Sequence, residues 1–126
     1  MEKGNQYESV LIVEEKHTAK AFGSGDLYVF STPMMVALME NAAMKSAELG
    51  GYATVGTSLN VKHIAATPMG HKVRAIAELI EIEGKKLVFR VTAFDEKEKI
   101  GEGVHERFII DVEKFMKKVG MKTRTL

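Results

Sequence analysis

The sequence contains no cysteine, which excludes disulfide bonds, thiolate metal ligands and a cysteine nucleophile. It also has no excess of either charge, because 18 basic and 17 acidic residues leave a formal net charge of +1. This balance gives no electrostatic basis for binding nucleic acid or an anionic membrane surface, so neither partner is expected. A chain without cysteine suits a reducing compartment, and we therefore expect a cytoplasmic protein.

Long apolar segments are missing as well. No stretch approaches the roughly 18 consecutive apolar residues that a membrane-spanning helix requires. Residues 1–6 lack the apolar region of a signal peptide. The sequence also shows no internal repeat and no linker. Its 126 residues therefore predict one domain, residues 1–126, which is long enough to bury its own core.

The clearest predicted element is a long helix that begins near Ser31 and Thr32. Either hydroxyl can cap its N-terminus, and Pro33 suits its first turn. The pair Gly50-Gly51 ends it. Between these limits nearly every face is apolar or small, which predicts a helix buried on all sides.

Glu40 lies inside this apolar helix, where an ionised carboxylate is costly to bury without a partner. One interpretation is a base or a nucleophile held in a mostly apolar site. The other is a structural carboxylate that pairs with a buried Arg or Lys, or that faces a solvated groove.

Strand patterns precede and follow the helix. The predicted strands cover residues 7–14, 54–66, 71–83, 86–95 and 100–111, with a loop at 15–26 and a short helix at 112–119 followed by a basic tail. Since short connections join the last four strands, we expect them to pair as antiparallel neighbours. The predicted class is α+β, with a curved antiparallel sheet wrapped around one long central helix, the hot-dog fold. Its open edges favour a homodimer or a higher homo-oligomer.

His63 is the histidine whose position best suits proton transfer. Strict alternation puts His63 on one face of its strand with Val55, Thr57 and Val61, and this face is expected to point at the helix and Glu40. A hydrogen-bonded core histidine is the alternative. In the same strand Gly56 indicates a bulge or a close backbone approach.

Other histidines give weaker signals. His105 stands beside Glu106 and Arg107, and a salt-linked strand surface is an adequate explanation for it. No pair of histidines has the helical spacing of metal ligands, so neither a metal nor a cofactor is expected.

Three separated motifs occur in order along the chain. They are Phe30–Glu40, then Val55-Gly56-Thr57 together with Val61–Gly70, and finally Ile100–Arg107. Together they resemble the fluoroacetyl-CoA thioesterase-like group of hot-dog proteins, over a span from Val29 to Lys118. The pieces His-x-Ala-Ala-Thr-Pro and His-Glu-Arg are the most distinctive.

The resemblance implies a role for five positions. Thr32, Glu40 and His63 match the catalytic threonine, glutamate and histidine of the family. Gly56 and Arg107 match positions that line the same pocket and are associated with substrate placement. The segment 17–30 departs from the family, because it looks shorter than the lid-bearing segment and lacks its proline- and phenylalanine-rich stretch. The resemblance therefore predicts thioester hydrolysis but not fluoroacetyl selectivity.

Two functions follow from these observations. The first is an acyl-CoA thioesterase that hydrolyses a small acyl-CoA, with Glu40 as nucleophile or base and with His63 and Thr32 as its partners. The second is a non-catalytic module that binds or senses acyl-CoA in the same pocket. The presence of all three catalytic residue types favours the enzyme. A hot-dog hydratase ranks last, because no helix segment carries the closely spaced Asp and His that it needs.

Overall fold

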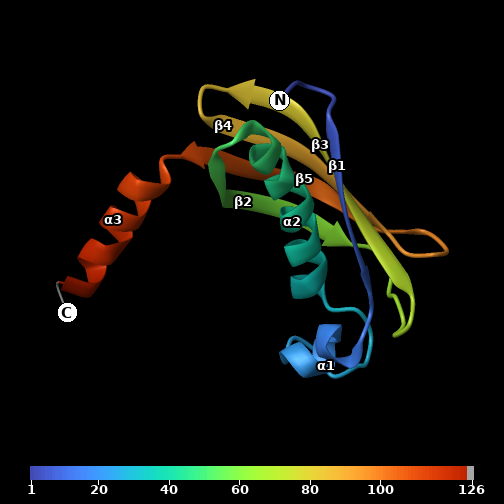
Figure 1. Cartoon of the computed structure of the whole chain (residues 1–126). Coiled ribbons are helices and arrows are strands. Elements are labelled where there is room, and N and C mark those ends of the chain that lie inside the picture. Colours follow the sequence, from blue (N-terminus) through green and yellow to red (C-terminus); the bar gives the residue numbers. More distant parts are fainter. Residues whose placement is uncertain (125–126) are drawn as a thin grey trace.

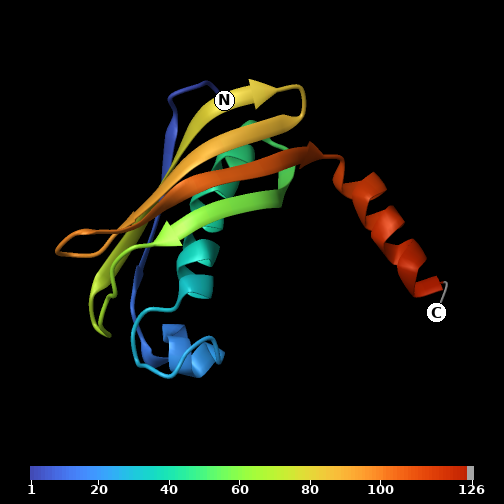
Figure 2. The same ribbon diagram turned by 180° about the vertical axis from the view of Figure 1, so that it is seen from behind.

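The structure, a computed structural model, describes residues 1–124, and one long helix lies across the face of its sheet (Figure 1). The elements are β1 (Gln6–Ile12), η1 (Glu15–His17), α1 (Ala19–Phe22), α2 (Thr32–Gly50), β2 (Ala53–His63), β3 (Lys72–Glu83), β4 (Lys86–Phe94), β5 (Lys99–Ile110) and α3 (Val112–Arg124). Helix α3 leaves the end of β5 and projects away from the sheet, as the reverse view also shows (Figure 2). None of the helices in residues 1–124 combines the length and the apolar character that crossing a bilayer requires.

The sheet is antiparallel throughout, with the strand order β1-β3-β4-β5-β2. This sheet packed on α2 confirms the predicted hot-dog architecture. The expectation that β2 and β3 are neighbours was wrong, because β2 pairs with β5 and β1 takes the free edge of β3. The cause lies in the connection 64–71, which is longer than a tight hairpin. Its residues Thr67 and Pro68 pair with the segment before α2 instead.

Helix α2 begins and ends where the sequence predicts. The Ser31 hydroxyl accepts a hydrogen bond from the Met34 N–H at 3.2 Å, so Ser31 is the cap. Gly51, at φ 77°, ends the helix in the left-handed conformation that glycine adopts without strain. The prediction of burial on all sides was wrong, because one sheet covers only one side of a helix. The uncovered face carries the exposed residues Pro33, Ala37 and Glu48, while the exposed Asn41 lies toward β1, where its Oδ1 atom accepts a hydrogen bond from Ser9.

The core lies between α2 and the sheet. Alternate residues of β3 and β4 point at the helix, as their sequence pattern predicts, and they are fully buried. These residues are Val73, Ala75, Ala77 and Leu79 of β3, and Leu87, Phe89, Val91 and Ala93 of β4. Helix α2 meets them with Met35, Met39, Ala42 and Ala43. The small alanines on both sides let the helix approach the sheet closely.

Two segments are more helical than predicted. Within residues 15–26, expected to be a loop, the chain forms η1 and the single turn α1. Thr18 caps α1 by accepting a hydrogen bond from the Ala21 N–H, and Gly23 ends it at φ 78°. Helix α3 continues to Arg124, beyond the predicted end at residue 119.

Candidate active site

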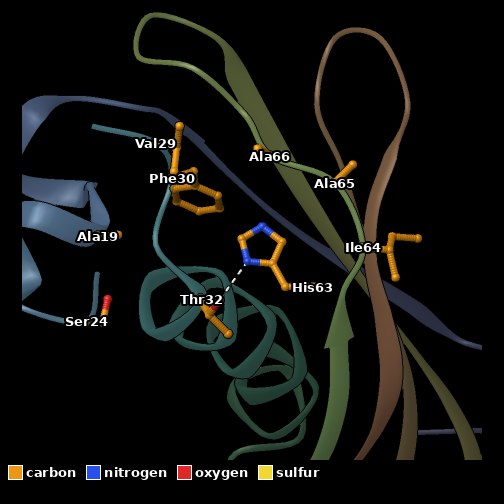
Figure 3. Close-up of a pocket in the computed structure, with 9 residues that line it drawn as sticks. All are labelled: Ala19, Ser24, Val29, Phe30, Thr32, His63, Ile64, Ala65 and Ala66. Atoms are coloured by element: carbon orange, nitrogen blue, oxygen red, sulfur yellow. Dashed lines mark hydrogen bonds between the residues drawn. The ribbon is translucent and has the colours of Figure 1, made fainter. Parts of the chain in front are cut away.

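The first turn of α2 forms a hydrogen-bonded pair with the end of β2. Because Ser31 provides the cap, the hydroxyl of Thr32 is free to bond the Nδ1 atom of His63 at 2.7 Å (Figure 3). Phe30 stands edge-on to the imidazole, with ring centroids 6.4 Å apart. The other ring nitrogen, Nε2 of His63, is buried and has no hydrogen-bond partner among the described residues. Whichever tautomer is present, the bond to Thr32 engages only one of the two imidazole nitrogens.

A pocket of about 340 Å³ opens beside this pair. Its walls come from α1, the approach to α2 and the segment after β2, namely Ala19, Ser24, Val29, Phe30, Thr32, His63, Ile64, Ala65 and Ala66. Burial lowers the pKa of His63, although the nearby backbone of Ala65 opposes that shift. The imidazole is therefore neutral near pH 7, as a group that accepts a proton must be.

Glu40 lies elsewhere on α2 and faces a buried arginine. The Nη1 atom of Arg107 is 3.6 Å from Glu40 Oε2, and the side chains are 7% and 43% exposed respectively. The Glu40 carboxylate thus has its charge balanced at one oxygen while part of it remains accessible. Glu40 is not among the residues that line the pocket beside His63.

Arg107 is fixed by bonds to the neighbouring strand β2 and to its own strand β5. Its Nε donates to Thr54 Oγ1 at 2.9 Å and its Nη2 to the Thr54 carbonyl at 3.1 Å. Its Nη1 lies 3.1 Å from Nε2 of His105, and Nδ1 of His105 lies 2.8 Å from the Ser58 carbonyl. Burial lowers the pKa of Arg107, and the Glu40 carboxylate opposes that shift. The guanidinium therefore stands in a defined orientation beside Glu40.

The interpretation of His105 as part of a strand surface was wrong. His105 is only 1% exposed and packs beside Phe89, at a centroid distance of 6.4 Å. The sequence contained a signal for this position, because His105 and Arg107 are two residues apart on one strand and must share a face. The charge of the neighbouring Glu106 indicates an exposed strand, whereas the alternation of His105 with Arg107 is the signal that agrees with the structure.

Gly56 reaches Glu40 because of an irregularity in β2. The register against β5 shifts between Gly56 and Ser58, so Thr57 is an extra residue. The predicted inward positions of Val55 and Thr57 were therefore wrong, because Val55 pairs with the outward-facing Phe108. A Cβ atom at position 56 would lie 2.6 Å from Glu40 Oε2. Any other residue here would require the end of the Glu40 side chain to move.

Within one chain the five predicted site residues form two groups along α2. Thr32 joins His63, while Glu40 joins Arg107 and Gly56. No hydrogen bond links Glu40 to the Thr32–His63 pair in the part of the chain that the structure describes. In residues 1–124 no three His, Asp or Glu side chains are arranged to hold a metal ion.

Known sequences match most of this chain. Residues 13–113 match the family model described as fluoroacetyl-CoA-specific thioesterase. The fluoroacetyl-CoA thioesterase of Streptantibioticus cattleyicolor is 45% identical over 98 residues, which are 75% of this chain and 70% of that protein.

Solved structures match the whole fold. The fluoroacetyl-CoA thioesterase FlK superposes with a TM-score of 0.88 at 36% identity, covering 97% of both chains. A threonine-to-serine mutant of FlK in complex with acetyl-CoA gives 0.90 at 36% identity, covering 98% of this chain and 99% of that one. A thioesterase superfamily member from Thermus thermophilus gives 0.87 at 25% identity, covering 99% and 97%.

Proposed function

Because this chain belongs to the fluoroacetyl-CoA-specific thioesterase family, we propose that it hydrolyses the thioester of a small acyl-CoA. The enzyme class is thioester hydrolase. The observation that carries the choice of site is the Thr32–His63 pair, because His63 bonds the Thr32 hydroxyl and both residues line a pocket of about 340 Å³.

In this proposal Glu40 carries out the chemistry at the thioester carbonyl. As a nucleophile, its carboxylate bonds to the carbonyl carbon, the carbon–sulfur bond breaks, and CoA leaves as a thiolate that takes a proton. Water then cleaves the resulting anhydride and regenerates Glu40. As a base, Glu40 instead removes a proton from the water that attacks the carbonyl. Both routes release the acid and free CoA, and both use the carboxylate that Arg107 faces.

The remaining residues have supporting roles in this mechanism. His63 moves protons at the pocket, and the hydroxyl of Thr32 orients its ring. The N–H of Gly56 is the proposed donor to the developing oxyanion. Arg107 places the substrate and Glu40 relative to one another. Burial favours the neutral imidazole that such proton transfer requires.

We further propose that a homodimer brings the two groups of site residues together. The exposed face of α2 and the free edge of β2 are the surfaces that a second copy would cover. Thr32 is itself exposed, so a second copy on this face would close the pocket against water. Sedimentation of the purified protein, measured together with activity across a dilution series, tests whether the dimer is the active form.

A panel of acyl-CoA substrates with a thiol-detecting reagent tests the function. We expect release of CoA from short acyl-CoA thioesters and a decrease with chain length. Glu40→Gln keeps the shape and removes the charge, and we expect it to lower kcat by at least about 10³-fold. Wild-type turnover in Glu40→Gln would contradict the assignment. Binding of acyl-CoA by calorimetry without thiol release would favour a binding or sensing module instead.

A further inference from the structure

Both ring nitrogens of His105 are assigned by their partners. The Ser58 carbonyl, 2.8 Å from Nδ1, can only accept a hydrogen bond, so Nδ1 carries the proton. The Arg107 guanidinium, 3.1 Å from Nε2, can only donate, so Nε2 accepts. His105 is therefore a neutral imidazole with one tautomer. Burial and the neighbouring Arg107 both lower its pKa and keep it neutral, against the opposing effects of the Ser58 bond, Glu40 and Glu106.

The bonds of Arg107 leave little freedom for its Nη1 atom. Nε and Nη2 donate to Thr54, which leaves the two hydrogens of Nη1 for His105 and Glu40. The contact with Glu40, at 3.6 Å, is longer than a direct hydrogen bond of about 2.7–3.2 Å. The 3.1 Å bond to His105 uses one Nη1 hydrogen and fixes where Nη1 stands relative to the carboxylate.

We propose that His105 is a positioning residue for Glu40. Its Nε2 atom holds Arg107 Nη1 so that the guanidinium balances the carboxylate charge without closing into a direct hydrogen bond. The free lone pairs of Glu40 then remain available to the thioester or to water. This role rests on the proposed function, in which Glu40 acts at the carbonyl.

The surroundings of His105 enclose its ring. Phe89 lies beside the ring, and the ring is 1% exposed. A Cβ atom on Gly56 would be 3.1 Å from the ring and 3.3 Å from Arg107 Nη1, so glycine at this position lets the imidazole and the guanidinium meet. The geometry thus links the bulged strand β2, through Ser58 and His105, to the position of Arg107.

Two substitutions separate the bonds of His105. His105→Gln keeps an acceptor at the position of Nε2, and His105→Asn keeps a donor near Nδ1 that does not reach Arg107. We expect His105→Asn to lower kcat by about 10- to 100-fold with KM within about threefold of wild type. His105→Gln should retain most of the turnover. His71→Gln, at a histidine outside this network, is the matched control and should behave like wild type in the same assay.

Several results would overturn the positioning role. Wild-type kcat in His105→Asn, or equal losses in the Gln and Asn variants, would do so. If neither variant folds, nitrogen-15 NMR of the wild-type histidines decides, because a proton on Nε2 of His105 contradicts the proposal and one on Nδ1 supports it. Glu40→Gln separates the two hypotheses: if it is inactive while His105→Asn is not impaired, the proposed function stands and only the role of His105 fails. If Glu40→Gln is fully active, the proposed function itself fails.

Discussion

The two polar groups on α2 differ in how completely their atoms are bonded. Around Arg107 each nitrogen of the guanidinium has a hydrogen-bond partner in Thr54 or His105, and the Ser58 carbonyl accepts a hydrogen bond from Nδ1 of His105. At the Thr32–His63 pair, one imidazole nitrogen has no partner among the described residues. A buried polar atom without a partner costs free energy, and a ligand that bonds to it recovers that cost. The comparison suggests that the first group is built for rigidity and the second for binding.

This difference predicts how substitutions should divide between stability and activity. Changes at the bonded network should destabilise the fold, because they leave buried groups unpaired. Changes at the Thr32–His63 pair should leave the free energy of unfolding almost unchanged and lower kcat. The following variants test that division.

His63→Gln should have the largest effect on turnover. It removes the group proposed for proton transfer, so kcat should fall by about 10²–10⁴-fold. Thermal denaturation should show a melting temperature close to wild type, since the His63 ring bonds the hydroxyl of Thr32, a residue that is itself exposed. A large loss of stability with preserved kcat would show that the Thr32–His63 pair supports the fold and not turnover.

Arg107→Ala should have the largest effect on stability. Its removal leaves Thr54, His105 and Glu40 without their partner, and we expect the free energy of unfolding to fall by about 3 kcal/mol. Urea denaturation measures this change. Arg90→Ala is the matched control, because Arg90 makes an exposed ion pair with Glu78 at 3.1 Å and should cost less than about 1 kcal/mol. Equal costs for the two arginines would show that the network around Arg107 adds no rigidity.

Gly56→Ala should perturb both properties moderately. The new Cβ would meet Glu40 Oε2 at 2.6 Å, and the flexible end of Glu40 must move away. We expect a loss of about 1 kcal/mol in unfolding free energy and about a tenfold fall in kcat. Gly120→Ala in α3, where no atom lies within 4 Å of the added Cβ, is the control. A Gly56→Ala enzyme with wild-type kcat would show that the position of Glu40 tolerates movement.

The smallest expected effect is a dependence of stability on pH. Burial lowers the pKa of His63 and of His105 in the folded protein. The unfolded chain therefore binds more protons than the folded one below pH ~6.5, and stability should decrease as the pH falls through that value. Melting temperatures between pH 8 and pH 5 measure the slope. His105→Gln should reduce it, and an unchanged slope would mean that His105 does not contribute.

Much of the fold could be predicted because local signals agree with the final packing. The faces of β3 and β4 follow simple alternation, and the cap and terminal glycine of α2 mark its ends. The pairing of β2 with β5 could not be predicted, because it depends on contacts of the connecting segment with residues far away in sequence. The exposed face of α2 was missed for a related reason, since an apolar pattern shows what can be buried but not how much cover the sheet provides.

The roles of the predicted site residues stay predictions, and their arrangement in the structure could not be predicted from the sequence. The motifs indicated Thr32, Glu40 and His63 as site residues. No sequence pattern shows that the Thr32–His63 pair lies at the start of α2, apart from the Glu40–Arg107 ion pair further along the helix. The burial of His105 was missed because one of its two partners, the Ser58 carbonyl, lies on β2, far away in sequence. That His105 and Arg107 share one face of β5 could be predicted from their spacing of two residues alone.

Because Thr57 is an extra residue in β2, the site depends on whether the number of positions between its members is odd or even. Gly56 and His63 are seven positions apart, an odd separation, and in a regular strand they would face opposite sides. They both face α2 because the bulge lies between them. Deleting one residue of the bulge would turn the side chains of one half of β2 to the opposite face of the sheet. None of the proposed catalytic side chains would itself be changed. For a relative of this protein, the count of residues between the glycine and the histidine is therefore as informative as their identities.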